Sequence, residues 1–258
     1  MNKSLFPLTN KYNQSWIKED PFYQSVLYYT EGLVEKMNLQ KGMRVLDLGC
    51  GGAISSIFLA REFDVQVWAV DREVSPTENF VRIQKMECEN KVFPLKADAR
   101  SLPLPFEFFD AVISIDSFSY YATDDWYLPY FSQFIKKNGE IGISEWCYSR
   151  EFRSINEVPD FLKECYLNLG FHGMHSLEWL KNHFEKAGLF KAKTAEIMPE
   201  NEFLLNNFIE TFKIMDSEKE IIKALQNDKE GIIQTYRFIA KRTDKSPYYG
   251  DFEDNQIA

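Results

Sequence analysis

The sequence has few of the features that mark membrane, secreted or nucleic-acid-binding proteins. Its 258 residues contain no apolar run near the roughly 20 residues that a membrane-spanning helix needs. The first residues lack the apolar stretch of a signal peptide, so we expect a cytoplasmic protein. The formal net charge of −9 disfavours nucleic acid, whose binding relies on clustered Lys and Arg. We therefore expect a small molecule as the partner, with no nucleic acid and no membrane span.

Cysteine is also scarce. The four cysteines, at positions 50, 88, 147 and 165, have no close paired spacing, which favours reduced thiols over a disulfide framework or a metal site. Apolar residues, by contrast, make up 45% of the chain and aromatic residues 16%. This is enough for the core of one large α/β domain, and we expect a monomer or a homodimer without a metal.

Hydrophobic patterning predicts alternating strands and helices. The expected strands cover residues 43–48, 65–70, 91–96, 109–115, 140–145, 189–198 and 232–240. Helical patterns cover residues 22–38, 54–62, 75–89, 127–135, 177–187 and much of 201–229. The first five strands follow a repeated βαβ rhythm, which predicts a parallel, doubly wound sheet. Ser75, Pro76 and Glu78 have the order of a capping box at a helix start.

The most informative stretch, residues 44–53, reads as a buried strand, a glycine turn and a helix start. Glycines let a ligand approach the main chain, and free N–H groups at the helix start favour the negative end of a ligand. Asp47 beside the turn could hold a positive group. Asp71 and Asp98 end the next two strands, and residues 116–121 follow the fourth. Because ligands of doubly wound sheets bind at the carboxyl ends of strands, these residues predict a nucleoside-containing ligand, with Asp71 accepting from both ribose hydroxyls.

The spacing of the glycines distinguishes between the possible nucleotide-containing ligands. A dinucleotide fingerprint G-x-G-x-x-G would place a third glycine at Ile54, and the G-x-x-x-x-G-K-[ST] phosphate loop is absent. A pyrophosphate also gains little from the nearby Asp47. A ligand with a cationic end fits better.

Five motifs in order resemble the class I S-adenosylmethionine (SAM) dependent methyltransferases that act on small molecules. These are Val45–Gly52, Val70-Asp71, Ala97–Ala99 with the proline loop 102–106, Phe109–Val112, and Ile135–Glu140. The resemblance covers about residues 40–144 and extends weakly to 240. The fold expected is α/β, a Rossmann-like methyltransferase fold, with a doubly wound, mostly parallel seven-stranded sheet, an antiparallel last strand and a helical cap.

The resemblance implies a SAM site, with S-adenosyl-L-homocysteine as the product. The backbone of Gly49, Cys50 and Gly51 would line the methionine moiety, with Asp47 near its ammonium group. Asp71 would bind the ribose. Asp98 would accept from the adenine amino group, and the Ala99 N–H would reach the ring.

Two positions depart from the family pattern. Arg72 stands where an aliphatic side chain often meets adenine, and its guanidinium could stack there instead. Asn138 replaces a proline in the turn before the fifth strand.

The sequence defines the site for the methyl acceptor less clearly than the SAM site. Asp116 would contact both cofactor and acceptor, and Asp116, Tyr121 and Glu145 are the candidate catalytic bases. Trp126, Trp146, Tyr12 and Trp16 could line an amine site or pack in the core. An amine is the leading acceptor, and a lipid-linked, carbon or oxygen acceptor is the alternative. A SAM-binding protein without catalysis and a nicotinamide-dependent oxidoreductase remain rival classes.

Domain organisation follows from the same pattern. We expect one methyltransferase domain over residues 1–258, with residues 1–38 as a helical lid segment. Residues 146–175 break the βαβ rhythm and are interpreted as a cap insertion. Residues 243–258 are expected to form a loose acidic tail.

Overall fold

A computed structural model describes residues 5–12, 22–215 and 218–247. In this part of the chain one sheet has seven strands in the order β3-β2-β1-β4-β5-β7-β6. The strands are β1 (Arg44–Leu48), β2 (Gln66–Asp71), β3 (Val92–Lys96), β4 (Phe109–Ile115), β5 (Ile135–Tyr148), β6 (Phe190–Ile197) and β7 (Ile233–Arg242). The strands β1 to β5 pair in parallel, and β7 is antiparallel to both β5 and β6. The predicted fold, including the antiparallel last strand, is confirmed.

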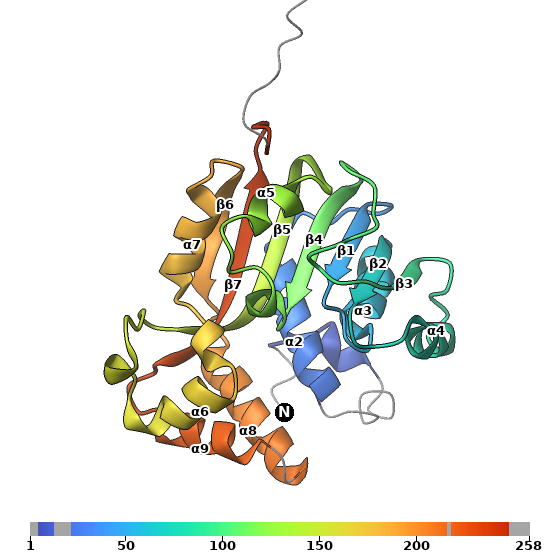
Figure 1. The fold of residues 1–258 in the computed structure, drawn as a ribbon. Helices are drawn as coiled ribbons and strands as arrows, with labels where there is room; N and C mark the ends of the chain where they lie inside the picture. The colour runs from blue at the N-terminus through green and yellow to red at the C-terminus, as the bar shows by residue number, and fades with distance from the viewer. Residues whose placement is uncertain (1–4, 13–21, 216–217, 248–258) are drawn as a thin grey trace, which may run out of the picture.

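Helices cover both faces of this sheet (Figure 1). They are α2 (Phe22–Val34), α3 (Ile54–Phe63), α4 (Pro76–Lys85), α5 (Tyr127–Ser132), α6 (Lys163–Asn168), α7 (Leu177–Glu185), α8 (Asn201–Met215) and α9 (Lys219–Asn227), with short 3-10 turns between some of them. One hydrophobic core joins α2, α3 and α4 to the sheet, and a second joins α5 and α7 to the opposite face. None of the helices described is both long and apolar enough to cross a membrane.

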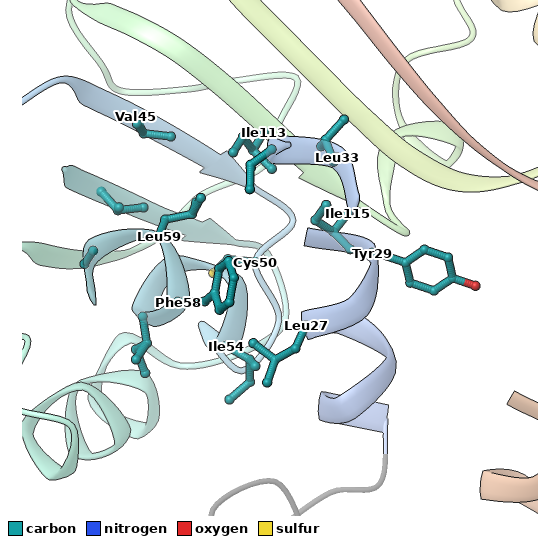
Figure 2. Close-up of a cluster of buried hydrophobic side chains, with 14 of the residues drawn as sticks. Leu27, Tyr29, Leu33, Val45, Cys50, Ile54, Phe58, Leu59, Ile113 and Ile115 are labelled. Carbon is teal, nitrogen blue, oxygen red and sulfur yellow. The ribbon is translucent and has the colours of Figure 1, made fainter. Parts of the chain in front are cut away.

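The first core explains why the glycine turn is held rigidly. Figure 2 shows Leu27 of α2 beside Ile54 of α3 and Leu33 of α2 beside Ile113 of β4, in one cluster that also contains Phe58 of α3. All five side chains are almost completely buried. The main chain of the turn between β1 and α3 is therefore fixed by large apolar side chains on its flanks, because burying each of these contributes about 1.5–3 kcal/mol.

The predicted capping box at α4 is present. The Ser75 side chain accepts from the Thr77 N–H, and the Glu78 carboxylate accepts from the Ser75 N–H. Asn79 on this helix is buried and donates to Gly51 O at 2.9 Å. The start of α4 thus supports the glycine turn from a second direction.

The boundary between α5 and β5 differs from the prediction. The expected helix over 127–135 ends at Ser132, and β5 begins at Ile135, which pairs with Phe109. The register then shifts so that Ala111 pairs with Glu140, and Asn138 takes a φ of +67°. The polar residues 136–139 therefore form an irregular part of the strand, in a conformation that asparagine tolerates.

Strand β5 also runs three residues beyond its predicted end. Residues 146–148 pair with residues 233–235 of β7. The interruption of the βαβ rhythm therefore begins after Tyr148. It contains the 3-10 turns Ile155–Glu157, Asp160–Leu162 and Phe171–Gly173 together with α6.

A third hydrophobic cluster lies beyond one end of the sheet, where Figure 1 shows α6, α8 and α9 grouped together. We call it the cap cluster. Its buried members include Leu162, Cys165, Phe171, Phe208 and Ile222. Residues after β5 and residues between β6 and β7 thus form one packed unit over the sheet end.

The two ends of the chain are described in part. Phe6 is buried in the core with α2, and residues 1–4 and 13–21 of the expected lid segment lie outside the described residues. Of the expected loose tail, Thr243 donates through its N–H to Leu189 O, and Lys245 Nζ donates to Ala187 O. Residues 248–258 lie outside the described part.

Candidate active site

A cavity of about 360 Å³ opens at the carboxyl ends of β1, β2 and β3 and beside the turn after β4. This is the point where the strand order reverses between β1 and β4, as expected for ligand binding in such sheets. We call it the first cavity. Five predicted cofactor residues line it, namely Gly49, Asp71, Arg72, Asp98 and Ala99.

Asp71 ends β2 and already accepts three backbone hydrogen bonds. Its Oδ1 accepts from the N–H groups of Glu73 and Val74, and its Oδ2 accepts from Gly51 N at 2.8 Å. An ionised carboxylate has about four lone-pair sites. In the described structure one such site, on Oδ2, is left beside the cavity. Asp71 therefore has acceptor capacity left for at least one ribose hydroxyl, and acceptance from both stays a prediction.

The glycine turn is tightly bonded within the protein. The N–H groups of Gly49 and Cys50 both donate to Val70 O, and that of Gly51 donates to Asp71. Gly49 lines the first cavity, whereas the described lining does not include Cys50 or Gly51. The predicted free N–H groups at the helix start are thus in part used to join the turn to β2.

Asp47 lies under the turn and is completely buried. Its Oδ2 accepts from Ser55 Oγ at 2.5 Å and from Ser56 Oγ at 2.6 Å, while Oδ1 has no partner among the described residues. Burial raises the pKa of Asp47 to about 6, although the two serine hydroxyls oppose the rise. The predicted cofactor carboxylate is therefore beneath the cavity lining, with one unpartnered oxygen.

The opposite wall contains Arg72, Asp98 and Ala99. Arg72 Nε bonds Glu73 at 2.7 Å, and its Nη1 lies 3.9 Å from Asp98 Oδ2. Asp98 Oδ1 accepts from Arg100 N at 2.8 Å, which leaves Oδ2 more accessible to a ligand. Both side chains are substantially exposed, so this wall is the more open one.

Tyr121 closes the floor of the first cavity beneath Gly49. Its hydroxyl lies 2.8 Å from Ser114 Oγ and donates to Leu48 O at 3.2 Å, and Ser117 Oγ donates to the same carbonyl. Burial is the main cause of a strongly raised pKa for the Tyr121 hydroxyl. The predicted base thus lies in a hydrogen-bonded floor, and the raised pKa keeps its hydroxyl protonated at neutral pH, which argues against a role as the base.

A second cavity, of about 140 Å³, adjoins the first at Tyr120, which lines both. Two of the predicted catalytic residues, Asp116 and Glu145, lie in its wall. Asp116 follows β4 with a left-handed φ of +49°, and its N–H donates to Ser144 O. Such a backbone conformation is uncommon for a residue with a side chain and is often found at functional sites.

The two carboxyl groups differ in their surroundings. Glu145 is 6% exposed, accepting from Tyr236 Oη at 3.0 Å and from Ser119 N at 3.3 Å. Burial and the nearby Asp116 charge raise the pKa of Glu145 to about 7. Burial raises the pKa of Asp116 to about 6. Asp116 therefore ionises first, and its charge disfavours ionisation of Glu145.

The rest of the second cavity is lined mainly by apolar residues, of which Trp146, Phe171 and Phe208 are aromatic and pack against the cap cluster or belong to it. Trp146 lies 4.8 Å from Phe208 and 6.1 Å from Phe171 between ring centroids, both at steep angles. Trp146 Nε1 donates to the hydroxyl of buried Tyr29 at 2.8 Å, which fixes the indole orientation. Sequence reasoning missed Phe171 and Phe208, because apolar residues in a loop and a helix carry no separate signal for a binding wall.

The other aromatic candidates lie elsewhere or are not described. Tyr12 is buried against Phe58, and Trp126 is 69% exposed at the edge of a shallow hollow beside Tyr130. Trp16 lies outside the described residues. Of the four predicted candidates, Trp146 alone lines the second cavity in the part of the chain that is described.

Comparisons with known proteins agree with this geometry. A family model described as a methyltransferase domain matches residues 45–139. Phosphoethanolamine N-methyltransferase 1 of Arabidopsis thaliana is 30% identical over 135 residues, covering 52% of this chain and 27% of that protein. A sterol 24-C-methyltransferase of Aspergillus fumigatus is 25% identical over 138 residues, covering 53% of this chain and 37% of that protein. The match thus spans roughly a third of the length of these curated relatives.

Solved structures show the same fold. Geranyl diphosphate C-methyltransferase of Streptomyces coelicolor, solved with S-adenosyl-L-homocysteine, superposes with a TM-score of 0.65 at 15% identity, covering 83% of this chain and 79% of that one. The family match thus assigns residues 45–139 to a methyltransferase domain, and the superposition and the strand order show that the chain has the Rossmann-like methyltransferase fold.

Proposed function

We propose that the protein binds SAM in the first cavity and transfers its methyl group to the nitrogen of a small-molecule amine in the second. The observation that carries the proposal is that the two cavities adjoin at Tyr120, with Asp116 and Glu145 beside the second. Carboxylates that face an aromatic wall favour a cationic acceptor. The phosphoethanolamine N-methyltransferase relative supports an amine. The sterol relative supports a carbon acceptor instead, which these two carboxylates favour less.

The residues of the first cavity fit the parts of SAM. The lone-pair site left on Asp71 would accept from one ribose hydroxyl, and Asp98 would accept from the adenine amino group. Gly49 would let the methionine moiety approach the main chain. The unpartnered Oδ1 of Asp47 is an acceptor beneath the turn for the ammonium end, directly or through water.

SAM supplies the methyl group: a nitrogen–carbon bond forms, the sulfur–carbon bond breaks with its electron pair left on sulfur, and S-adenosyl-L-homocysteine is released. The protein's part is to hold the nitrogen in line and to take the proton that the nitrogen loses. Orientation of this kind can lower a barrier by up to roughly 7–11 kcal/mol. Glu145, whose pKa is about 7, is suited to accept the proton near neutral pH.

The cap residues 149–175 would exclude water from this step, because Phe171 and Met174 line the second cavity. The cytoplasmic location and the choice between monomer and homodimer stay predictions from the sequence.

The ribose assignment is tested with Asp71→Asn, which keeps one oxygen acceptor. Titration calorimetry with S-adenosyl-L-homocysteine should show about 10- to 100-fold weaker binding, because a hydrogen bond to a charged group contributes about 1.5–3 kcal/mol. Asp160→Asn, an exposed aspartate outside both cavities, is the control. Equal affinity of Asp71→Asn and the unmodified protein would contradict the assignment.

Deoxy analogues of the ligand separate ribose binding from loop disruption. Of the 2′- and 3′-deoxy forms of S-adenosyl-L-homocysteine, one should bind the unmodified protein weakly and lose little further affinity in Asp71→Asn. If the losses from Asp71→Asn and from each deoxy analogue simply add, Asp71 affects binding only by holding the backbone of Gly51, Glu73 and Val74.

The rival classes need two further assays. A thermal-shift comparison of SAM with NAD distinguishes a methyltransferase from an oxidoreductase. Labelled methyl transfer from SAM into a mixture of amines distinguishes an enzyme from a binding protein without catalysis.

A further inference from the structure

The second cavity has an acidic end and an apolar end. Resting on the function proposed above, we propose that its acceptor is an arylalkylamine: a primary or secondary amine on a short chain that carries one aromatic ring and no anionic group. The amine nitrogen would lie beside Asp116 and Glu145, and the ring would lie against the wall that Trp146, Phe171 and Phe208 form.

The acidic end selects a cation. Glu145 is held by Tyr236 and Ser119, so its carboxylate has a fixed position, and Asp116 stands at the end of the adjacent strand β4. Among the described residues, the lining of the second cavity contains these two acids and no Lys, Arg or His. A phosphate or carboxylate on the acceptor would meet the negative charge of Asp116, and that of Glu145 once it ionises, in a poorly solvated site, which disfavours it.

The apolar end fits one ring. The whole second cavity, including its acidic end, has a volume of about 140 Å³, close to that of an engineered cavity of about 150 Å³ that binds benzene, so it has room for one ring and not for two. Trp146 meets Phe208 at an interplanar angle of 69° and Phe171 at 82°. These edge-on contacts leave ring faces and edges available to a further aromatic group. The Tyr29 hydroxyl fixes Trp146, so the wall is preorganised.

Two lining positions, Gly173 and Leu169, are suited to test the ring site. A Cβ added at Gly173, which lines the cavity, would meet no heavy atom within 4 Å, so a larger side chain there would extend into open space. Leu169 also lines the cavity and is 42% exposed. Leu167, two residues earlier, is 59% exposed and lies outside the described lining, which makes it a matched control.

The test is calorimetry on the protein loaded with S-adenosyl-L-homocysteine, with four probes: 2-phenylethylamine, ethanolamine, phosphoethanolamine and phenylacetate. We expect 2-phenylethylamine to bind at least about 10-fold more tightly than ethanolamine, since the ring buries apolar surface. We expect no measurable binding of phosphoethanolamine or phenylacetate. Labelled SAM should then yield N-methylated 2-phenylethylamine.

Variants assign the binding to this cavity. Gly173→Leu should weaken 2-phenylethylamine at least about 10-fold while leaving the affinities for ethanolamine and S-adenosyl-L-homocysteine unchanged. Leu169→Ala should weaken 2-phenylethylamine a few-fold, and Leu167→Ala should not. Glu145→Gln should weaken both amines.

Two failures are distinguishable. Preference for phosphoethanolamine, or equal affinity for ethanolamine and 2-phenylethylamine, with intact binding of S-adenosyl-L-homocysteine would overturn the ring site and leave methyl transfer standing. Failure of the protein to bind either SAM or S-adenosyl-L-homocysteine would overturn the proposed function itself and the ring site with it.

Discussion

Glu145 gives the protein a pH-dependent stability that one substitution should remove. The native state raises the pKa of this carboxyl group from its ordinary value of 4.5 to about 7 through burial and the Asp116 charge. Between these two pH values the native state keeps a proton that the unfolded state has lost. Stability is therefore fully present below about pH 4.5 and is lost as the pH rises through about 7.

The magnitude follows from the pKa rise and the burial of the group. Each pH unit corresponds to 1.36 kcal/mol, so the rise amounts to about 3 kcal/mol in total and about 2–3 kcal/mol between about pH 5 and pH 8. Because Glu145 is 6% exposed, solvent screening removes little of this. Glu145→Gln keeps the shape, can still accept from Ser119 N, and lacks the charge.

The assay is urea unfolding at several pH values between about 5 and 8, without ligand. The difference in the free energy of unfolding, Glu145→Gln minus unmodified protein, should rise by about 2–3 kcal/mol across this range. Asp47 and Asp116 add a similar pH dependence to both proteins and leave most of the difference unaffected. Glu178→Gln, at an exposed position on α7, is the control. A difference that stays constant within about 0.5 kcal/mol would refute the reasoning.

Two further substitutions test the supports of the site. In Gly49→Ala the new Cβ would lie 2.6 Å from Ser117 Cβ. Gly42 has a similar positive φ and open space around it, so Gly42→Ala is the control. We expect thermal unfolding to show that Gly49→Ala destabilises the protein by about 1–3 kcal/mol more than Gly42→Ala does. In Tyr29→Phe the indole N–H of Trp146 loses its acceptor, which should cost about 1–3 kcal/mol in urea unfolding and weaken amine binding without changing affinity for S-adenosyl-L-homocysteine. Equal stability of the two glycine variants, or unchanged stability of Tyr29→Phe, would contradict these contacts.

The fold could be predicted because its signals are local. The apolar run 109–115 and the turn after Leu48 each depend on neighbouring residues, and the capping box at Ser75 spans four positions. The start of β5 was wrong because residues 136–139 are polar and glycine-containing, which is typical of a turn. Their strand geometry depends on pairing with β4, a partner more than twenty residues away, and no local pattern records it.

The two cavities differ in the same way, because the first depends on local sequence signals and the second on long-range packing. The predicted cofactor residues that line the first cavity come directly after strands that the sequence pattern indicates, so their positions could be predicted. The three backbone hydrogen bonds to Asp71 and the burial of Asp47 could not be predicted. The second cavity joins Asp116 and Glu145, at sheet ends, to Phe171 and Phe208 of the cap cluster. Its shape depends on how that cluster docks on the sheet. The cofactor end that we propose thus depends on local strand–turn motifs, and the acceptor site that we propose depends on long-range packing. Substitutions in the cap should therefore change which amine is bound before they change whether SAM is bound.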